Sequence, residues 1–120
     1  MPSRQEKEMK LRGTRVEISI REMLMASYLS IKENKQMMDF LREHYGNVRS
    51  AYVLTCTPEQ GEDLYEVLIN GEFILGFEIS RISGEISDVE ETSVAVYSKK
   101  LRGKRSNLKM LIALDLANNH

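Results

Sequence analysis

The chain has 120 residues, of which 42% are hydrophobic and 29% are charged, a composition typical of one globular domain rather than of a disordered or fibrous chain. Its single cysteine, Cys56, excludes an intramolecular disulfide and a multi-cysteine zinc site. No segment approaches the roughly 20 consecutive apolar residues that cross a bilayer, and residues 1–13 lack the apolar stretch of a secretory signal. We therefore expect a cytoplasmic protein that does not associate with membranes.

Two helices are predicted in the first half of the chain. Ser19 and Glu22 have the capping-box spacing, in which each side chain accepts a hydrogen bond from the other residue's free amide, and the same spacing recurs at Ser30 and Glu33. Apolar residues follow each box at helical intervals. These are Met23, Leu24, Tyr28 and Ile31 in the first helix and Met37, Met38, Leu41 and Tyr45 in the second.

The sequence predicts where the second helix ends, but it leaves two interpretations for the start of the first. Gly46 is placed to end the second helix as its left-handed residue. At the start of the first helix, apolar and polar residues alternate over residues 16–20. A short strand at residues 16–20 is therefore an alternative interpretation.

From Asn47 onward the apolar period changes to two, which predicts strands. We expect a strand over residues 50–57 and an acidic loop over residues 57–63. A hairpin follows, formed by residues 64–69 and 72–79. It is the clearest signal in the chain, because the intervening Asn70-Gly71 is a dipeptide preferred in two-residue type I′ turns.

The end of the chain predicts one more strand and one more helix. A turn at Ser83-Gly84 and a strand near residues 92–101 complete an antiparallel meander of about four strands. Ser106 is placed to cap a final helix that reaches Leu116. Two asparagines, Asn118 and Asn119, are suitable stops.

The predicted fold class is therefore α+β, with N-terminal helices, an antiparallel sheet of about four strands and a C-terminal helix. We expect residues 1–14 to be a charged, flexible N-terminal segment. Residues 15–120 are expected to form a single α+β domain.

The two-residue turn also predicts which side chains share a face of the hairpin. It places Leu68 opposite Phe73, Glu66 opposite Leu75, and Leu64 opposite Phe77. One face then carries Leu64, Leu68, Phe73, Leu75, Phe77 and Ile79, and the other carries Tyr65, Val67, Ile69 and Ile74. Because both faces are apolar, helices or a second chain should cover each of them, and the apolar segment 108–116 is a candidate cover.

Charge is distributed unevenly, although the formal net charge is only -1. Residues 57–91 contain ten acidic residues and one basic residue, Arg81, whereas residues 99–109 hold six basic residues and no acidic one. The separated charges either neutralise one another inside the fold, hold two copies together or attract a charged partner. The sequence leaves these alternatives open.

Catalytic chemistry has little support in the sequence. His44 is the only internal histidine, and no serine lies in a Gly-x-Ser-x-Gly elbow. Cys56 alternates with Leu54 and Tyr52, which favours a buried, inert thiol. The carboxylates lack metal-ligand spacing, and neither a P-loop nor a dinucleotide fingerprint is present. We expect no catalytic residue, no metal site and no cofactor.

The first functional hypothesis is a non-enzymatic protein-binding domain, such as a regulator, adaptor or inhibitor, that is able to form a homodimer. Its expected partner-binding residues lie in the acidic loop and are Glu59, Glu62 and Asp63. The alternative is a nucleic-acid-binding module that uses the basic segment 99–109 to neutralise phosphates. Its expected contacts are Lys99, Lys100, Arg102, Lys104 and Arg105. A third hypothesis is an enzyme whose site is completed by dimerisation.

Overall fold

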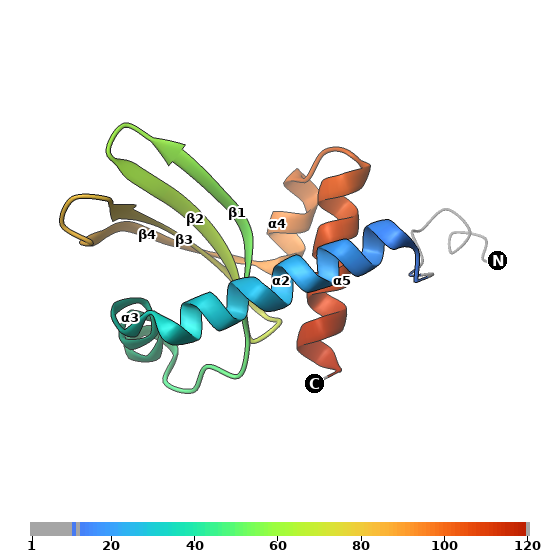
Figure 1. Cartoon of the computed structure of the whole chain (residues 1–120), viewed down its shortest axis with the longest axis horizontal. Coiled ribbons are helices and arrows are strands. Elements are labelled where there is room, and N and C mark those ends of the chain that lie inside the picture. Colours follow the sequence, from blue (N-terminus) through green and yellow to red (C-terminus); the bar gives the residue numbers. More distant parts are fainter. Residues whose placement is uncertain (1–10, 12, 120) are drawn as a thin grey trace.

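The computed structural model describes residue 11 and residues 13–119, and Figure 1 shows their arrangement. The elements in chain order are helices α2 (Arg15–Glu33) and α3 (Lys35–Tyr45), strands β1 (Ala51–Glu59), β2 (Glu62–Ile69), β3 (Phe73–Ser80) and β4 (Ile86–Ser93), and helices α4 (Val94–Lys100) and α5 (Lys104–Asn118). The strands form one antiparallel sheet in the order β1-β2-β3-β4. The predicted α+β meander between N-terminal and C-terminal helices is confirmed.

Helix α2 begins earlier than predicted because Thr14, rather than Ser19, is its N-cap. The hydroxyl of Thr14 accepts a hydrogen bond from the amide of Glu17 at 3.2 Å, and the carboxylate of Glu17 accepts one from the amide of Gly13 at 2.7 Å. The box at Ser19 was therefore the wrong start, and the alternative strand at residues 16–20 is wrong as well. The inward-facing apolar residues of α2 recur at helical spacing, which favours the helix over the strand.

The second predicted box is also wrong, because Ser30 lies inside α2. Asn34 separates α2 from α3 instead, and its side-chain oxygen accepts a hydrogen bond from the amide of Met37 at 3.1 Å. Helix α3 then ends before Gly46, whose φ of 77° is left-handed. The stop predicted at Gly46 is thus confirmed.

The chain reverses at Asn70-Gly71 as predicted, but the hairpin register is shifted by one residue. Both turn residues have left-handed φ, 55° and 71°. Glu72 is an additional residue after the turn, so Ile69 pairs with Phe73. The shift gathers one set of apolar side chains on one face. This face carries Tyr65, Val67, Ile69, Phe73, Leu75 and Phe77, while Leu64, Leu68 and Ile74 lie on the other.

A β-bulge in β1 reverses the expected position of Cys56. The register shifts between Val53 and Thr55, so that Leu54 faces one side and Cys56 pairs with Tyr65 on the other. The thiol is exposed rather than buried. Residues 57–63 also differ from the prediction, since β1 and β2 extend through them and leave a tight turn at Gln60-Gly61.

The last strand and the last helix both begin away from their predicted positions. The fourth strand is β4, and the segment predicted as a strand near residues 92–101 is mostly helix α4, which Ser93 caps by accepting a hydrogen bond from the amide of Val96 at 3.1 Å. Helix α5 begins after Gly103, so Ser106 lies inside its first turn and is not the cap. Its end at Asn118, with Asn119 as C-cap, agrees with the predicted stop.

Helices of the same chain cover the apolar core residues on both faces of the sheet. One core lies between the sheet and helices α2 and α5, and contains Ile20, Leu24, Tyr52, Leu54, Leu68, Ile74, Met110, Ile112, Ala113 and Leu116. The second lies between the sheet, α3 and the end of α2, and contains Ile31, Met37, Met38, Leu41, Ala51, Val67, Ile69, Leu75 and Phe77. The prediction that each apolar face is covered is confirmed, and segment 108–116 is part of the first cover.

Within residues 11 and 13–119, no helix has both the length and the apolar character that crossing a bilayer requires. Most of the predicted flexible segment 1–14 lies outside the described residues, so its flexibility stays a prediction. Its last two residues, Gly13 and Thr14, belong to the cap of α2.

Candidate functional site

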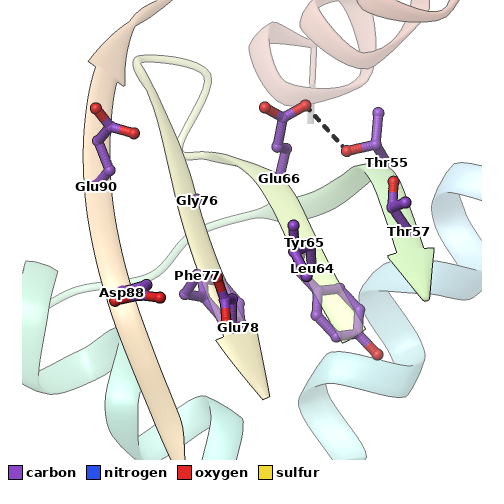
Figure 2. Close-up of a pocket in the computed structure, with 10 residues that line it drawn as sticks. All are labelled: Thr55, Thr57, Leu64, Tyr65, Glu66, Gly76, Phe77, Glu78, Asp88 and Glu90. Carbon is purple, nitrogen blue, oxygen red and sulfur yellow. Dashed lines mark hydrogen bonds between the residues drawn. The ribbon is translucent and has the colours of Figure 1, made fainter. Parts of the chain in front are cut away.

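The face of the sheet that packs on α2 and α5 is covered only where these two helices contact it. Toward the β1–β2 and β3–β4 turns, the sheet diverges from the ribbons of α2 and α5 (Figure 1). The exposed and half-exposed residues there include four carboxylates. We call this surface the acidic sheet face and define it by the carboxylates of Glu62, Glu66, Glu78, Asp88 and Glu90. Figure 2 shows Glu66, Glu78, Asp88 and Glu90 on neighbouring strands β2, β3 and β4.

The acidic sheet face encloses a shallow hollow of about 420 Å³. Its floor includes Gly76, where a Cβ atom would meet only backbone oxygens, at 3.7 and 3.8 Å. Thr55 and Thr57 on β1 add hydroxyl groups at one side, whereas Asp88 and Glu90 on β4 stand at the other (Figure 2). Among the described residues, no lysine or arginine lines this hollow, so no described lining residue neutralises the carboxylates.

Glu66 is held in place by two hydroxyl groups from different elements. Thr55 of β1 donates a hydrogen bond to its carboxylate at 2.9 Å, and Tyr97 of α4 donates another at 2.7 Å. Burial and this hydrogen bond to Glu66 raise the pKa of Tyr97, so the phenol stays a donor. Glu66 thereby links the acidic sheet face to α4.

The charge of Glu78 depends on its neighbours. Hydrogen bonds from its side chain to Glu62 and Asp88, together with desolvation and the negative charges of these two residues, raise the pKa of Glu78 to about 7. Glu78 therefore carries a proton below that pH. Above it, the acidic sheet face gains one further negative charge.

The predicted contact residues Glu59, Glu62 and Asp63 are separated by the structure. Glu62 belongs to the acidic sheet face. Asp63 points to the opposite side of the sheet, following the alternation along β2, and is paired with the guanidinium group of Arg81. Arg81 also donates hydrogen bonds to the backbone oxygens of Glu59 and Glu62. This one arginine thus partly neutralises the predicted acidic loop and ties the β1–β2 turn to the β3–β4 turn.

Sequence reasoning did not identify Glu66, Glu78, Asp88 and Glu90 as one site. Part of the signal was present, because Glu66 comes four positions after Glu62 and Glu90 comes two positions after Asp88. In a strand, such even spacing places each pair on one face. The order of strands and the register between them were needed to bring the two pairs together.

Neither His44 nor Cys56 contributes to the acidic sheet face. His44 lies on α3, where its Nε2 atom is 3.6 Å from a carboxylate oxygen of Glu91. Cys56 pairs with Tyr65 of β2, and the side chains of both residues face the opposite side of the sheet from the hollow. The hollow therefore brings neither a histidine nor a thiol to the carboxylates.

The five predicted phosphate-binding residues lie together at the corner between α4 and α5. We call this surface the basic corner, and it consists of Lys99, Lys100, Arg102, Lys104 and Arg105, all of them exposed. The start of α2 adjoins it, since Arg15 and Arg105 line the same small depression. In the described part of the chain, none of these five residues forms an ion pair with a carboxylate. The acidic middle of the chain therefore does not neutralise the basic corner.

Lys109, the last residue of the basic segment, differs from the other five. It is half-buried beside Leu54, Tyr97 and Met110. Desolvation, and secondarily the charge of Arg105, lower the pKa of Lys109. It belongs to the packing of α5 rather than to the basic corner.

In residues 11 and 13–119, no group of three or more His, Cys, Asp or Glu side chains is arranged to hold a metal ion. In comparisons with known proteins, no family model, no curated protein and no solved structure matches this chain.

Proposed function

We propose that this chain is a non-enzymatic protein-binding domain whose acidic sheet face receives a basic, extended segment of another protein. The observation that carries this proposal is the open hollow around Gly76, whose described lining contains carboxylates and no basic side chain. A row of like charges next to an open surface attracts a partner of opposite charge and orients it during association.

The position of β4 supports an extended partner. It is an edge strand, and all of its side chains are exposed or half-exposed. Asp88 and Glu90 project from it into the hollow (Figure 2). A segment lying beside β4 can use backbone hydrogen bonds for affinity and alternate basic side chains for specificity.

The proposal is tested with synthetic oligolysine and alternating Lys-Thr peptides, whose binding is measured by fluorescence anisotropy at low and physiological salt. We expect binding that weakens with salt. The double variant Glu78→Gln/Glu90→Gln should raise Kd about tenfold, which corresponds to roughly 1.4 kcal/mol. Gly76→Val should also weaken binding, because it fills the floor of the hollow without changing any charge.

The matched control is Glu43→Gln/Glu72→Gln, which removes two carboxylates that are exposed outside the hollow. It should leave Kd within about twofold, since long-range charge effects are screened. Equal losses for the two double variants would show that only net charge matters. That result, or no peptide binding even at low salt, would refute the proposal.

A second candidate function is nucleic-acid binding through the basic corner. It is favoured by the observation that these five exposed cations have no carboxylate partner among the described residues and lie beside Arg15. Clustered cations of this kind release counterions from a phosphate backbone.

The test is binding to random-sequence DNA and RNA over a salt series. Replacing Lys100, Arg102, Lys104 and Arg105 by Ser should weaken binding and flatten its salt dependence. Replacing Lys35 and Arg42 of α3 by Ser is the control and should change neither. Absence of binding by the wild type at low salt would eliminate this function.

A further inference from the structure

Helix α2 has a second apolar side that no described element covers. Its inner side, with Ile20, Leu24 and Ile31, packs on β1, α3 and α5. On the outer side, Ile18, Met25 and Leu29 are 50%, 48% and 56% exposed. Apolar side chains scattered singly over a surface need no explanation, but three on one flank of one helix indicate an interface.

The spacing of this outer side is that of a helix–helix contact. Ile18, Glu22, Met25 and Leu29 follow one another at intervals of four, three and four residues, which is the seam that a helix presents to one partner helix. We call these four residues the outer seam. Met25 and Leu29 also border an apolar hollow of about 280 Å³ that extends to Tyr28 and Tyr52.

The outer seam is complementary to itself when two helices run in opposite directions. Its intervals read the same from either end, so an antiparallel pair of α2 helices places Ile18 of each copy opposite Leu29 of the other. Glu22 and Met25 are then the central pair. Such an arrangement has a twofold axis, which is the commonest symmetry of protein dimers.

Charge supports the same arrangement at both ends. Arg15 stands at the first turn of α2 and Lys32-Glu33 at the last, so antiparallel packing in this register places Arg15 opposite Lys32 and one residue from Glu33 of the second copy. In the described part of the chain, neither Arg15 nor Glu33 forms an ion pair. The ammonium group of Lys32 is held 5.0 Å from the ring centre of Tyr28, leaving Glu33 to meet the arginine.

We propose that this chain forms a twofold-symmetric homodimer in which α2 packs antiparallel against α2 of a second copy through the outer seam. Glu22 is the one charged residue of the seam. A polar residue at such a position selects register and orientation at a cost in affinity. The dimer shares no residue with the acidic sheet face, and only Arg15, at its end, adjoins the basic corner.

Sedimentation equilibrium of the full chain over a wide concentration range tests the dimer. Leu29→Glu should weaken association at least tenfold because it brings charge into the seam, and Glu22→Leu should strengthen it about tenfold. Val96→Glu is the matched control, since Val96 is 48% exposed on α4, outside the seam. Circular dichroism verifies that each variant is folded.

The charge reversals test the antiparallel orientation. Arg15→Glu and Glu33→Arg should each weaken the dimer severalfold, and the double variant should restore it. A monomer at all concentrations, or a dimer that Leu29→Glu leaves intact, would overturn the proposal. Equal effects of Leu29→Glu and Val96→Glu, or no recovery in the double variant, would also contradict the proposed packing.

Discussion

At the scale of single residues, Glu78 shows how far one side chain depends on strands distant in sequence. Its contacts with Glu62 of β2 and Asp88 of β4 raise its pKa from 4.5 to about 7. The folded state therefore binds this proton more tightly than the unfolded chain does. The resulting contribution to stability is present below pH 4.5 and is lost as the pH rises through about 7.

Carbon-13 NMR of the carboxyl groups measures this titration directly. We expect a midpoint near 7 for Glu78 in the wild type. Glu62→Ala should move the midpoint down toward the ordinary value, because it removes a hydrogen-bonding partner and a neighbouring negative charge. Glu72→Ala, which changes an exposed residue in the β2–β3 turn, should leave it unchanged. A wild-type midpoint near 4.5 would contradict the contacts described for Glu78.

At the scale of elements, the start of α2 distinguishes a cap from a serine that only has the right spacing. Thr14→Ala removes the hydroxyl that accepts the hydrogen bond of Glu17, and it should lower the free energy of unfolding by about 1 kcal/mol. Ser19→Ala should be neutral or slightly stabilising, since Ser19 is exposed within the helix. Urea denaturation compares the two, and a larger loss for Ser19→Ala would contradict the observed helix start.

The β2–β3 turn makes a second prediction at this scale. The side-chain oxygen of Asn70 accepts hydrogen bonds from the amides of Arg49 and Ser50 at 2.6 and 3.2 Å, and its amide group donates one to the oxygen of Asn47 at 2.9 Å. Asn70→Gly keeps the left-handed backbone but loses all three. It should therefore lower the free energy of unfolding by about 1–3 kcal/mol.

Asn70→Asp is the matched variant for this turn. It keeps the two acceptor contacts and loses only the donor, so its loss in urea denaturation should be the smaller one. Equal losses for Asn70→Gly and Asn70→Asp would show that these side-chain contacts do not stabilise the turn.

At the scale of the whole molecule, one sheet connects two cores. Leu68 and Leu75 lie on opposite faces and are both fully buried. Each change to Ala should lower the free energy of unfolding by about 2–5 kcal/mol. Because the strands belong to both cores, near-ultraviolet circular dichroism and tyrosine fluorescence should report one shared transition in each variant. Separate transitions would show that the two cores unfold independently.

The same sheet explains which sequence-based predictions were wrong. The turn at Asn70-Gly71 was predictable from its dipeptide, but Glu72 as an extra residue was not, and it changed the neighbour of every residue on β3. The bulge near Leu54 likewise turned Cys56 outward. Local patterns carry no information on such insertions, because their positions depend on which faces the helices cover.

The amino-acid sequence by itself determined the class of fold, the reversal at Asn70-Gly71 and the separation of acidic from basic segments, because each depends on neighbours a few residues apart. Only the tertiary structure decided that Glu62, Glu66, Glu78, Asp88 and Glu90 share one open surface. It also decided that Arg81, in the β3–β4 turn, pairs with Asp63 of the predicted acidic loop. Both results depend on strand order and register, which arise from contacts between residues far apart in the chain.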